Sequence, residues 1–312
     1  MSVQLLASKI KANIEKVIYG KSDKIDLILC AMFSGGHILL DDVPGTGKTS
    51  LARALARSLS SDVKRIQFTP DLLPSDITGI NYYDRKTNDF IFREGPVFTN
   101  ILIADEINRT TPRTQSALLE CMGEFQTTVD GETYKMKPMF FVIATQNPIE
   151  SQGTFPLPEA QTDRFIMKTS IGYPEREGEL MMLDEHRTLS PLDTLEAVCT
   201  TDDIVAAYDE VRRVNVDEKI KDYVIKIVSE TRNSSRIRLG VSPRGTLALM
   251  RASQAYAAMQ GRDYVIPDDV KAVAVPVLSH RIITRTNTTQ SVAQNNETVI
   301  EFIIDTVKAP IE

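Results

Sequence analysis

The stretch from His37 to Leu55, HILLDDVPGTGKTSLARAL, constrains the fold more than any other part of the chain. An apolar run, Ile38 to Leu40, leads into the turn-forming residues Asp42 to Gly47, and leucines then recur every four residues from Leu51 to Leu59. This order predicts a strand, a tight loop and a helix. Such a loop aims backbone N–H groups and the positive end of a helix dipole at one point, which favours a bound polyphosphate.

Individual residues of the loop suit this interpretation. Gly45 and Gly47 can adopt the positive φ angles that turn amide groups inward. Lys48 is placed to reach the β and γ phosphates, and the Thr49 hydroxyl is placed to hold Mg²⁺. Asp42 stands where the general pattern has its first glycine, and a glycine-rich surface loop before a helix is the alternative interpretation. The residues predicted to bind nucleotide here are Asp42, Pro44, Gly45, Thr46, Gly47, Lys48, Thr49 and Ser50.

Two later strands end in polar residues. The apolar run Ile101 to Ala104 stops at Asp105 and Glu106, and the apolar run Met139 to Ala144 is followed closely by Asn147. The carboxyl ends of parallel strands meet at one edge of a sheet, beside the mouth of the phosphate loop. These polar side chains are therefore predicted to face a ligand there. The alternatives are two surface acids on a solvated strand end and an ordinary Asn-Pro turn.

The surrounding patterns predict an α/β domain. Two helices with apolar faces, at Leu5 to Val17 and Ile25 to Phe33, come before the loop, and Val63 to Phe68 is a further predicted strand. Prolines and a glycine are expected to interrupt regular structure between residues 70 and 79. Hairpins are predicted at Asn81 to Arg93 and, around an Asp-Gly turn, at Thr127 to Lys135.

Beyond Pro174 the alternation of strands and helices stops. Helical patterns cover 175–187, 202–214, 217–232, 243–260 and 267–281, a polar loop covers 286–296, and a closing helix covers 297–307. Helix starts are marked by Thr200 with Asp203, by Asn215 with Glu218, and by Ser242-Pro243. The prediction is an α/β domain at 1–187 and an all-helical domain at 194–312, with the linker between them.

Composition limits the class of protein. With 312 residues, 42% hydrophobic and 25% charged, the chain is expected to form two globular domains. The net charge is −6, so the chain does not have the strongly basic composition typical of nucleic-acid-binding proteins. The cysteines Cys30, Cys121 and Cys199 are far apart and odd in number, which favours thiols in a reducing compartment. The N-terminus does not resemble a signal peptide, and no apolar window is long enough for a membrane span. A cytoplasmic location is expected.

Taken together, these motifs resemble the MoxR group of AAA+ ATPases. Gly45 to Thr49 resembles the Walker A motif, Ile101 to Glu106 the Walker B motif, Asn147 sensor 1, and Ser242-Pro243-Arg244 sensor 2. The stretches ADEINR, ATQNPIE and LPEAQTDRF closely resemble sequences typical of the family, and the similarity extends from about Ile14 to Arg281. An acidic residue commonly takes the place of the first Walker A glycine in this family, which suits Asp42.

The resemblance implies a P-loop α/β domain with β-hairpin insertions, a helical lid, and ATP bound between the two. It implies Mg²⁺ held by Thr49 and Asp105, an attacking water polarised by Glu106, and Asn147 fixing the position of that water. It also implies assembly into rings, usually hexamers, in which the hairpins face the pore or a partner. Relatives are associated with partner proteins that carry von Willebrand factor A-type domains.

Arginines are expected to complete the site. Arg164, near the end of a short helix, is the first choice for an arginine supplied to a neighbouring subunit, with Arg109 and Arg113 as alternatives. In isolation, Arg164 would be interpreted as an ordinary cation at a helix C-terminus. Arg244 is expected to sense the γ-phosphate from the lid. Two further residues, Tyr19 and Gly20, lie where relatives hold the adenine.

Three functions remain open from the sequence. The first is an ATP-driven chaperone or remodeller of proteins. The second is a nucleic-acid motor, which the acidic balance and the lack of an appended DNA-binding module disfavour. The third is a scaffold that binds ATP without hydrolysing it, which the intact Asp105, Glu106 and Asn147 disfavour.

Overall fold

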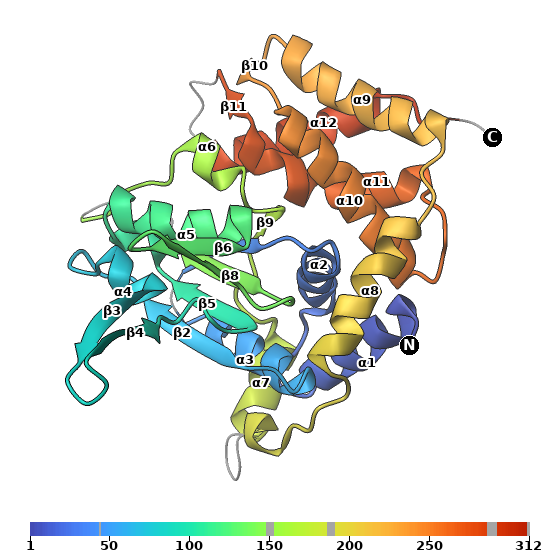
Figure 1. The fold of residues 1–312 in the computed structure, drawn as a ribbon. Coiled ribbons are helices and arrows are strands. Elements are labelled where there is room, and N and C mark those ends of the chain that lie inside the picture. The colour runs from blue at the N-terminus through green and yellow to red at the C-terminus, as the bar shows by residue number, and fades with distance from the viewer. Residues whose placement is uncertain (44, 148–152, 186–190, 286–291, 311–312) are drawn as a thin grey trace.

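A parallel sheet forms the centre of the protein (Figure 1). The structure is a computed structural model that describes residues 1–43, 45–147, 153–185, 191–285 and 292–310. Among these residues, five parallel strands pair in the order β2-β5-β8-β1-β9. The strands are β1 (Ile38–Asp41), β2 (Val63–Gln67), β5 (Ile101–Asp105), β8 (Phe141–Gln146) and β9 (Met167–Thr169). The predicted α/β sheet is confirmed.

Alternation along β1 explains how the sheet is covered on both faces. Ile38 and Leu40 point into one core with α1 (Val3–Ile14), α2 (Ser22–Phe33) and α3 (Lys48–Ser58), whereas Leu39 belongs to a second core. That second core is shared with α5 (Pro112–Glu124). Successive side chains of a strand point to opposite faces, so a fully apolar strand requires helices on both sides.

Both predicted hairpins are confirmed. They are β3 (Gly79–Asp84) with β4 (Asp89–Glu94), and β6 (Gln126–Val129) with β7 (Glu132–Lys135). Phe92 and Tyr134 stack with ring centroids 3.9 Å apart, so the two hairpins lie together. The break expected between residues 70 and 79 is wrong in one part, because Pro74 begins the short helix α4 (Pro74–Thr78). Proline is compatible with the first turn of a helix, where no intrahelical N–H bond is lost.

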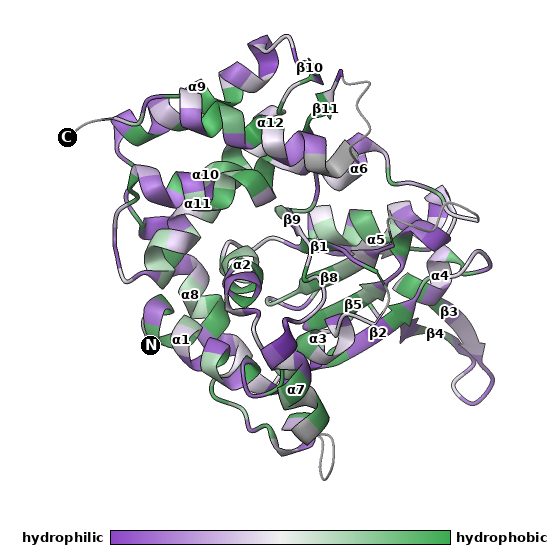
Figure 2. Ribbon diagram, turned by 180° about the vertical axis from the view of Figure 1, so that it is seen from behind, coloured by the Kyte–Doolittle hydropathy of each residue, from purple (hydrophilic) through white to green (hydrophobic). Residues whose placement is uncertain are grey.

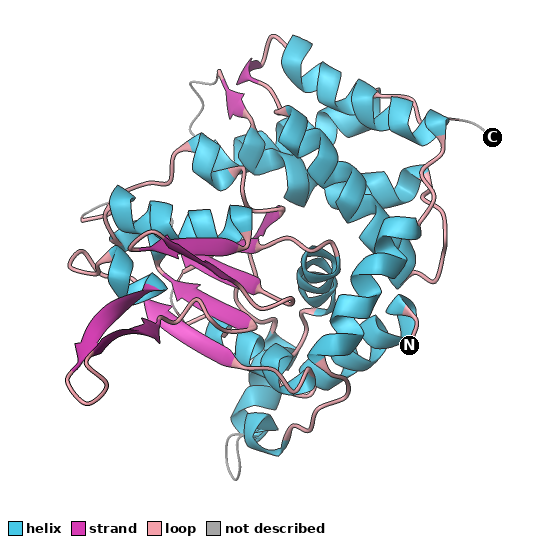
Figure 3. Cartoon of the chain, in the orientation of Figure 1, coloured by secondary structure: helices cyan, strands magenta, loops and turns pink. Residues whose placement is uncertain are grey.

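The C-terminal part is largely helical, as predicted (Figure 3). After α6 (Glu159–Thr162) the helices are α7 (Arg176–Glu185), α8 (Thr201–Arg213), α9 (Glu218–Asn233), α10 (Pro243–Met259), α11 (Pro267–Leu278) and α12 (Val292–Thr306). Short 3₁₀ turns cover Ile107–Arg109, Pro191–Thr194 and Ser279–Arg281. The antiparallel pair β10 (Ile237–Leu239) and β11 (Ile283–Thr284) is an addition that the sequence analysis missed.

Two boundaries differ from the predictions. Asp217, not Asn215, caps α9, and its carboxylate accepts the Lys219 amide proton at 2.9 Å. Asn215 instead pairs through its backbone with Asp263 and Val265. Helix α12 begins at Val292, inside the stretch expected to be a polar loop. Residues 188–190 of the expected linker lie outside the described residues, and the division into two domains stays a prediction.

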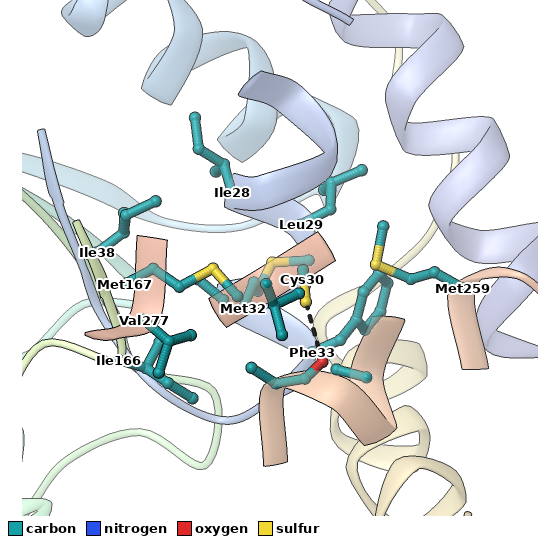
Figure 4. Close-up of a cluster of buried hydrophobic side chains, with 14 of the residues drawn as sticks. Ile28, Leu29, Cys30, Met32, Phe33, Ile38, Ile166, Met167, Met259 and Val277 are labelled. Carbon is teal, nitrogen blue, oxygen red and sulfur yellow. Dashed lines mark hydrogen bonds between the residues drawn. The ribbon is translucent and has the colours of Figure 1, made fainter. Parts of the chain in front are cut away.

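One apolar core joins the sheet to the C-terminal helices. Helix α2 lies between them in Figure 1, and Figure 4 shows its side chains beside Ile166 and Met167 on one side and Met259 on the other. The Cys30 thiol donates to the Ala252 carbonyl at 3.3 Å across this contact. Figure 2 shows hydrophobic residues, coloured green, along parts of α2, α8 and α10. Cys30, Cys121 and Cys199 are free and buried, as expected of thiols, and burial raises the pKa of Cys121 and of Cys199 to about 11.

Candidate nucleotide site

The glycine-rich loop follows the carboxyl end of β1 and leads directly into α3. Gly45 and Gly47 have φ angles of 87° and 84°, where only glycine is free of strain. Gly47 is the residue before the helix, and no side chain caps the first turn of α3. Helices normally leave their first N–H groups for a capping side chain, water or a ligand. The predicted strand, loop and helix are therefore present, with a helix N-terminus free to meet an anion. Pro44 lies outside the described residues.

The Lys48 side chain turns back across the loop. Its ammonium donates to the carbonyl of Asp42 at 3.0 Å and to the carbonyl of Val43 at 2.8 Å. An ammonium group has three donors, so one is left for a ligand in this arrangement. Thr46 also stabilises the loop, because its hydroxyl donates to the Val43 carbonyl at 3.3 Å. Thr49 lies half-buried in the first helical turn.

Asp42 has a structural partner that the sequence analysis did not foresee. Its carboxylate is buried and accepts three hydrogen bonds, from the Ser170 hydroxyl at 2.7 Å, the Ile171 amide at 2.7 Å and the Gly172 amide at 2.9 Å. The side chain thus ties the start of the phosphate loop to the segment after β9. A glycine at this position could not make these bonds, which gives a physical reason for the departure from the general pattern.

A cavity of about 240 Å³ opens beside the loop. The loop supplies Gly45, Thr46 and Gly47, and Ser50 adds the first turn of α3. The opposite wall is mostly apolar and includes Tyr19, whose role in holding a base stays a prediction; its other members are Val17, Ile18, Lys21, Ile171, Gly172, Pro174, Pro191 and Leu192. Gly20 follows Tyr19 in the chain with a φ of 67°. Such a wall suits a flat aromatic base, while the loop suits its phosphates.

The acidic pair at the end of β5 is held by neighbouring strands. Asp105 accepts the Thr145 hydroxyl at 2.6 Å and the Arg65 guanidinium at 2.7 Å. Glu106 has the left-handed angles φ 58° and ψ 50°, which turn it away from the strand direction. Its carboxylate accepts the Gln67 amide at 2.8 Å and pairs with Arg109 at 3.1 Å.

Sequence reasoning missed Arg65, Gln67 and Thr145. Gln67 stands opposite Asp105 in the register of β2 and β5, and Arg65 is two residues earlier on the same face. Arg65 and Gln67 are polar residues two positions apart in β2. This pattern could indicate contact with the acidic pair only after β2 was known to lie beside β5. Asn147 follows β8, and its carbonyl accepts from the Asn108 side chain at 3.4 Å. Asp105, Glu106 and Asn147 all lie at the strand ends on the edge of the sheet where the phosphate loop begins.

Among the described residues, no group of three or more His, Cys, Asp or Glu side chains could hold a metal ion by itself. Mg²⁺ in nucleotide sites is commonly held by one or two protein ligands together with phosphate oxygens and water. The Thr49 hydroxyl and the Asp105 carboxylate provide ligands of that kind. This donor set fits an ion that binds together with a nucleotide.

Arg164 lies at the other edge of the sheet, where the strands begin. Ile38 of β1 pairs with Met167 of β9, and the Ile166 amide donates to the His37 carbonyl at 2.9 Å. Arg164 therefore stands beside the start of β1, while the phosphate loop follows its end. Its guanidinium donates to the Leu119 carbonyl of α5.

Arg244 lies with Arg164 rather than with the phosphate loop. Both line a cavity of about 390 Å³ that shares no lining residue with the cavity beside the loop. The structure thus brings these two arginines together but does not place ATP between Arg244 and the loop of the same chain, as the resemblance implied. Arg109 pairs with Glu106 at the carboxyl edge, and Arg113 is exposed on the first turn of α5.

His37 connects three elements at the amino edge. Its Nε2 lies 3.1 Å from the Met122 carbonyl, and its Nδ1 accepts the Val142 amide at 3.1 Å. The Nε2 atom therefore carries the proton of a neutral ring. Burial lowers the pKa of His37 to about 4, against an ordinary value of 6.5. The ring is a buried structural group and stays uncharged at neutral pH.

The comparisons with known proteins agree with this geometry. Residues 37–167 match the family described as "ATPase family associated with various cellular activities (AAA)", and residues 229–302 match the AAA lid domain. A solved structure of a candidate ATPase from Cytophaga hutchinsonii is 37% identical, with a TM-score of 0.89, and the match covers 99% of this chain and 96% of that one. The fold and site thus define an AAA+ ATPase with a helical lid.

Curated relatives narrow the assignment. Chaperone MoxR1 of Mycobacterium tuberculosis is 38% identical over 96% of this chain and 81% of its own length. Protein MoxR of Methylorubrum extorquens is 29% identical over 97% and 95% of the two chains. The uncharacterized protein YeaC of Bacillus subtilis is 49% identical over 98% and 96%. The chain belongs to the MoxR family of AAA+ ATPases. None of its described helices combines the length and the apolar character that crossing a membrane requires.

Proposed function

We propose that this protein hydrolyses Mg-ATP within a ring of identical subunits, hexameric by family resemblance, and uses the energy to remodel partner proteins. One observation carries the proposal: the phosphate loop and the acidic pair lie at one edge of the sheet, and Arg164 and Arg244 lie at the other. A site divided in this way is complete only where one subunit meets the next.

Each residue has a defined task in this proposal. The amides of Gly45 to Thr49 and the Lys48 ammonium bind the phosphates. Glu106 accepts the proton of the attacking water, and Asn147 orients that water. Thr49 and Asp105 would hold Mg²⁺, which would supply positive charge against the phosphate oxygens. Glu106 must leave Gln67 and Arg109 before it can act as the base.

Arg164 and Arg244 are proposed to act on the nucleotide of the adjacent subunit. An arginine supplied in this way to a P-loop site is worth about 10³ to 10⁵ in turnover. Isolated subunits should therefore be almost inactive. Phosphate release measured over a dilution series should fall more steeply than the protein concentration. A specific activity that is independent of concentration would contradict the shared site, and no phosphate release at any concentration would favour a nucleotide-gated scaffold.

The first hairpin offers a surface for a protein client. Tyr83 and Phe90 are 50% and 69% exposed, and their rings meet edge to face with centroids 5.4 Å apart. Contiguous exposed apolar groups can form a site of protein contact, and these two rings touch each other. By family resemblance, we propose that the clients include proteins with von Willebrand factor A-type domains.

The client proposal can be tested by affinity capture. The Glu106→Gln variant with ATP should retain the ATP-bound state and capture the client. The same variant with Phe90→Ser should lose the client but keep its nucleotide. Salt-sensitive binding of duplex DNA that stimulates turnover would instead favour a nucleic-acid motor.

A further inference from the structure

The cavity that contains Arg164 and Arg244 holds more positive charge than its own chain neutralises. Four arginines line it, Arg164, Arg244, Arg251 and Arg281, and Asp163 is the single acidic residue among the described residues of its wall. Asp163 is already engaged, because its carboxylate accepts the Arg281 guanidinium at 2.7 Å and the Ser242 hydroxyl at 2.9 Å. His37, which also lines the wall, is neutral. Arg281 takes up the one carboxylate, so Arg164, Arg244 and Arg251 have no carboxylate partner within the described wall of the cavity.

Helix α10 presents two of these cations on one face. Arg244 and Arg251 are seven residues apart, close to two full turns, so they lie about 10 Å apart along the helix axis. Both are exposed, and Leu247 between them is 50% exposed. Like charges on one exposed face repel each other unless an anion lies between them. The spacing suits an extended polyanion better than a single carboxylate.

The chain's own nucleotide cannot be that anion. The cavity lies where β1 and β9 begin, and the phosphate loop follows the opposite end of β1. Four residues of strand and the loop itself separate the two positions. An anion for this cavity must therefore come from another molecule.

We propose that Arg251 is a third cation of the shared site and contacts the phosphates of the nucleotide bound to the neighbouring subunit, alongside Arg164 and Arg244. The inference rests on the proposed function, because it requires a ring in which this cavity faces the next phosphate loop. It adds a residue that none of the sequence motifs includes.

Arg251→Ala should lower turnover per assembled subunit about ten- to hundredfold, the range expected for losing one charge-assisted contact to phosphate. The turnover of Arg251→Lys should lie between those of the wild type and Arg251→Ala, because lysine keeps the charge but lacks the guanidinium geometry. Binding of a fluorescent ADP analogue to isolated subunits should be unchanged. The matched control is Arg238→Ala, an exposed arginine on β10 outside this cavity, and it should keep wild-type turnover.

Light scattering should show that Arg251→Ala assembles like the wild type. If the variant instead loses assembly and regains full turnover once concentrated into rings, Arg251 contacts the neighbour's protein surface and the proposal is wrong. Weakened ADP binding by the isolated Arg251→Ala subunit would also overturn it, because that result would place Arg251 at its own nucleotide. An equal loss of turnover in Arg238→Ala would show that the effect comes from general surface charge, and it would also overturn the proposal.

Mixing variants before assembly separates this inference from the proposed function. Glu106→Gln has a dead site but intact arginines, so it should restore turnover to Arg251→Ala subunits placed beside it. Arg164→Ala mixed with Glu106→Gln tests the shared site itself. Restoration with Arg164→Ala but not with Arg251→Ala refutes the role of Arg251 alone. Failure of both mixtures refutes the shared site.

Discussion

The two edges of the central sheet carry opposite and unequal sets of charges. At the carboxyl edge, Asp105 and Glu106 are paired with Arg65 and Arg109 in the same chain. At the amino edge, cations converge on a cavity in which Asp163, the one acidic residue of its described wall, is already engaged. In the isolated chain, therefore, the acidic side chains of the carboxyl edge are neutralised by arginines, whereas three of the four arginines at the amino edge have no carboxylate partner within the described wall of the cavity. In the proposed ring, an anion from a neighbouring subunit would balance the amino edge.

Removing the principal cation of the amino edge should have the largest effect. Arg164→Ala is expected to reduce ATP turnover by about 10³ to 10⁵ while leaving nucleotide affinity of isolated subunits unchanged. Steady-state phosphate release and equilibrium binding measure the two quantities. Arg113→Ala and Arg109→Ala serve as comparison variants. If Arg164→Ala keeps full activity and one of them does not, the role belongs to that residue.

The matching change at the carboxyl edge is Glu106→Gln. Loss of a general base typically costs about 10² to 10⁴ in rate, so turnover should fall by that amount. ATP binding should persist, because the phosphate loop is untouched, and trapped ATP can be measured by filtration. Wild-type turnover in this variant would remove Glu106 from the role of base.

Acid should destabilise the folded chain by protonating His37, which lies at the amino edge of the sheet. Its pKa is about 4 in the folded chain and 6.5 ordinarily, so the unfolded chain binds the proton more readily. The contribution of His37 to the free energy of unfolding is therefore fully present above pH 6.5. It falls by about 3 kcal/mol as the pH drops toward 4. Urea unfolding between pH 7 and pH 4 measures it.

The control for this pH effect is His37→Gln, which cannot titrate and should show a shallower pH dependence than the wild type. Burial and the adjacent Arg281 also lower the pKa of His280, so part of the slope should remain in the variant. An unchanged slope would mean that His37 is not the titrating group.

A smaller change should perturb Arg164 indirectly. A methyl group on Gly123 would lie 2.3 Å from the Arg164 guanidinium, so Gly123→Ala must displace it. We expect turnover to fall about tenfold, a fraction of the full arginine effect. A double-mutant cycle is the measurement: in an Arg164→Ala background the same substitution should have little further effect. Additive losses would show that Gly123 acts through something other than Arg164.

Local patterns were sufficient to predict much of this structure. Apolar runs located the core strands, the Asp130-Gly131 pair fixed a hairpin turn, and the strand-end acids lie at the predicted edge of the sheet, where the phosphate loop begins. Each of these signals is contained within a few neighbouring residues, where backbone geometry and side-chain alternation act directly.

What sequence reasoning missed depends on contacts between distant segments. Arg65 became relevant only through the strand order that sets β2 beside β5. The position of Arg244 depends on how α10 packs near Asp163, far away in the chain. The strands β10 and β11 are too short to show any alternation, and they form because residues 237–239 and 283–284 meet in space.

The continuous core around α2 has a consequence for cooperativity. Because apolar side chains of α1, α2 and α3 pack in the same cluster as those of α8 to α12, the lid cannot melt while the rest stays intact without exposing that cluster to water. Heat or denaturant should therefore unfold both parts in one transition. A subunit whose lid melts with its sheet cannot keep half of the candidate site, so in the proposed ring each unfolded subunit would remove both its phosphate loop and its arginines at once.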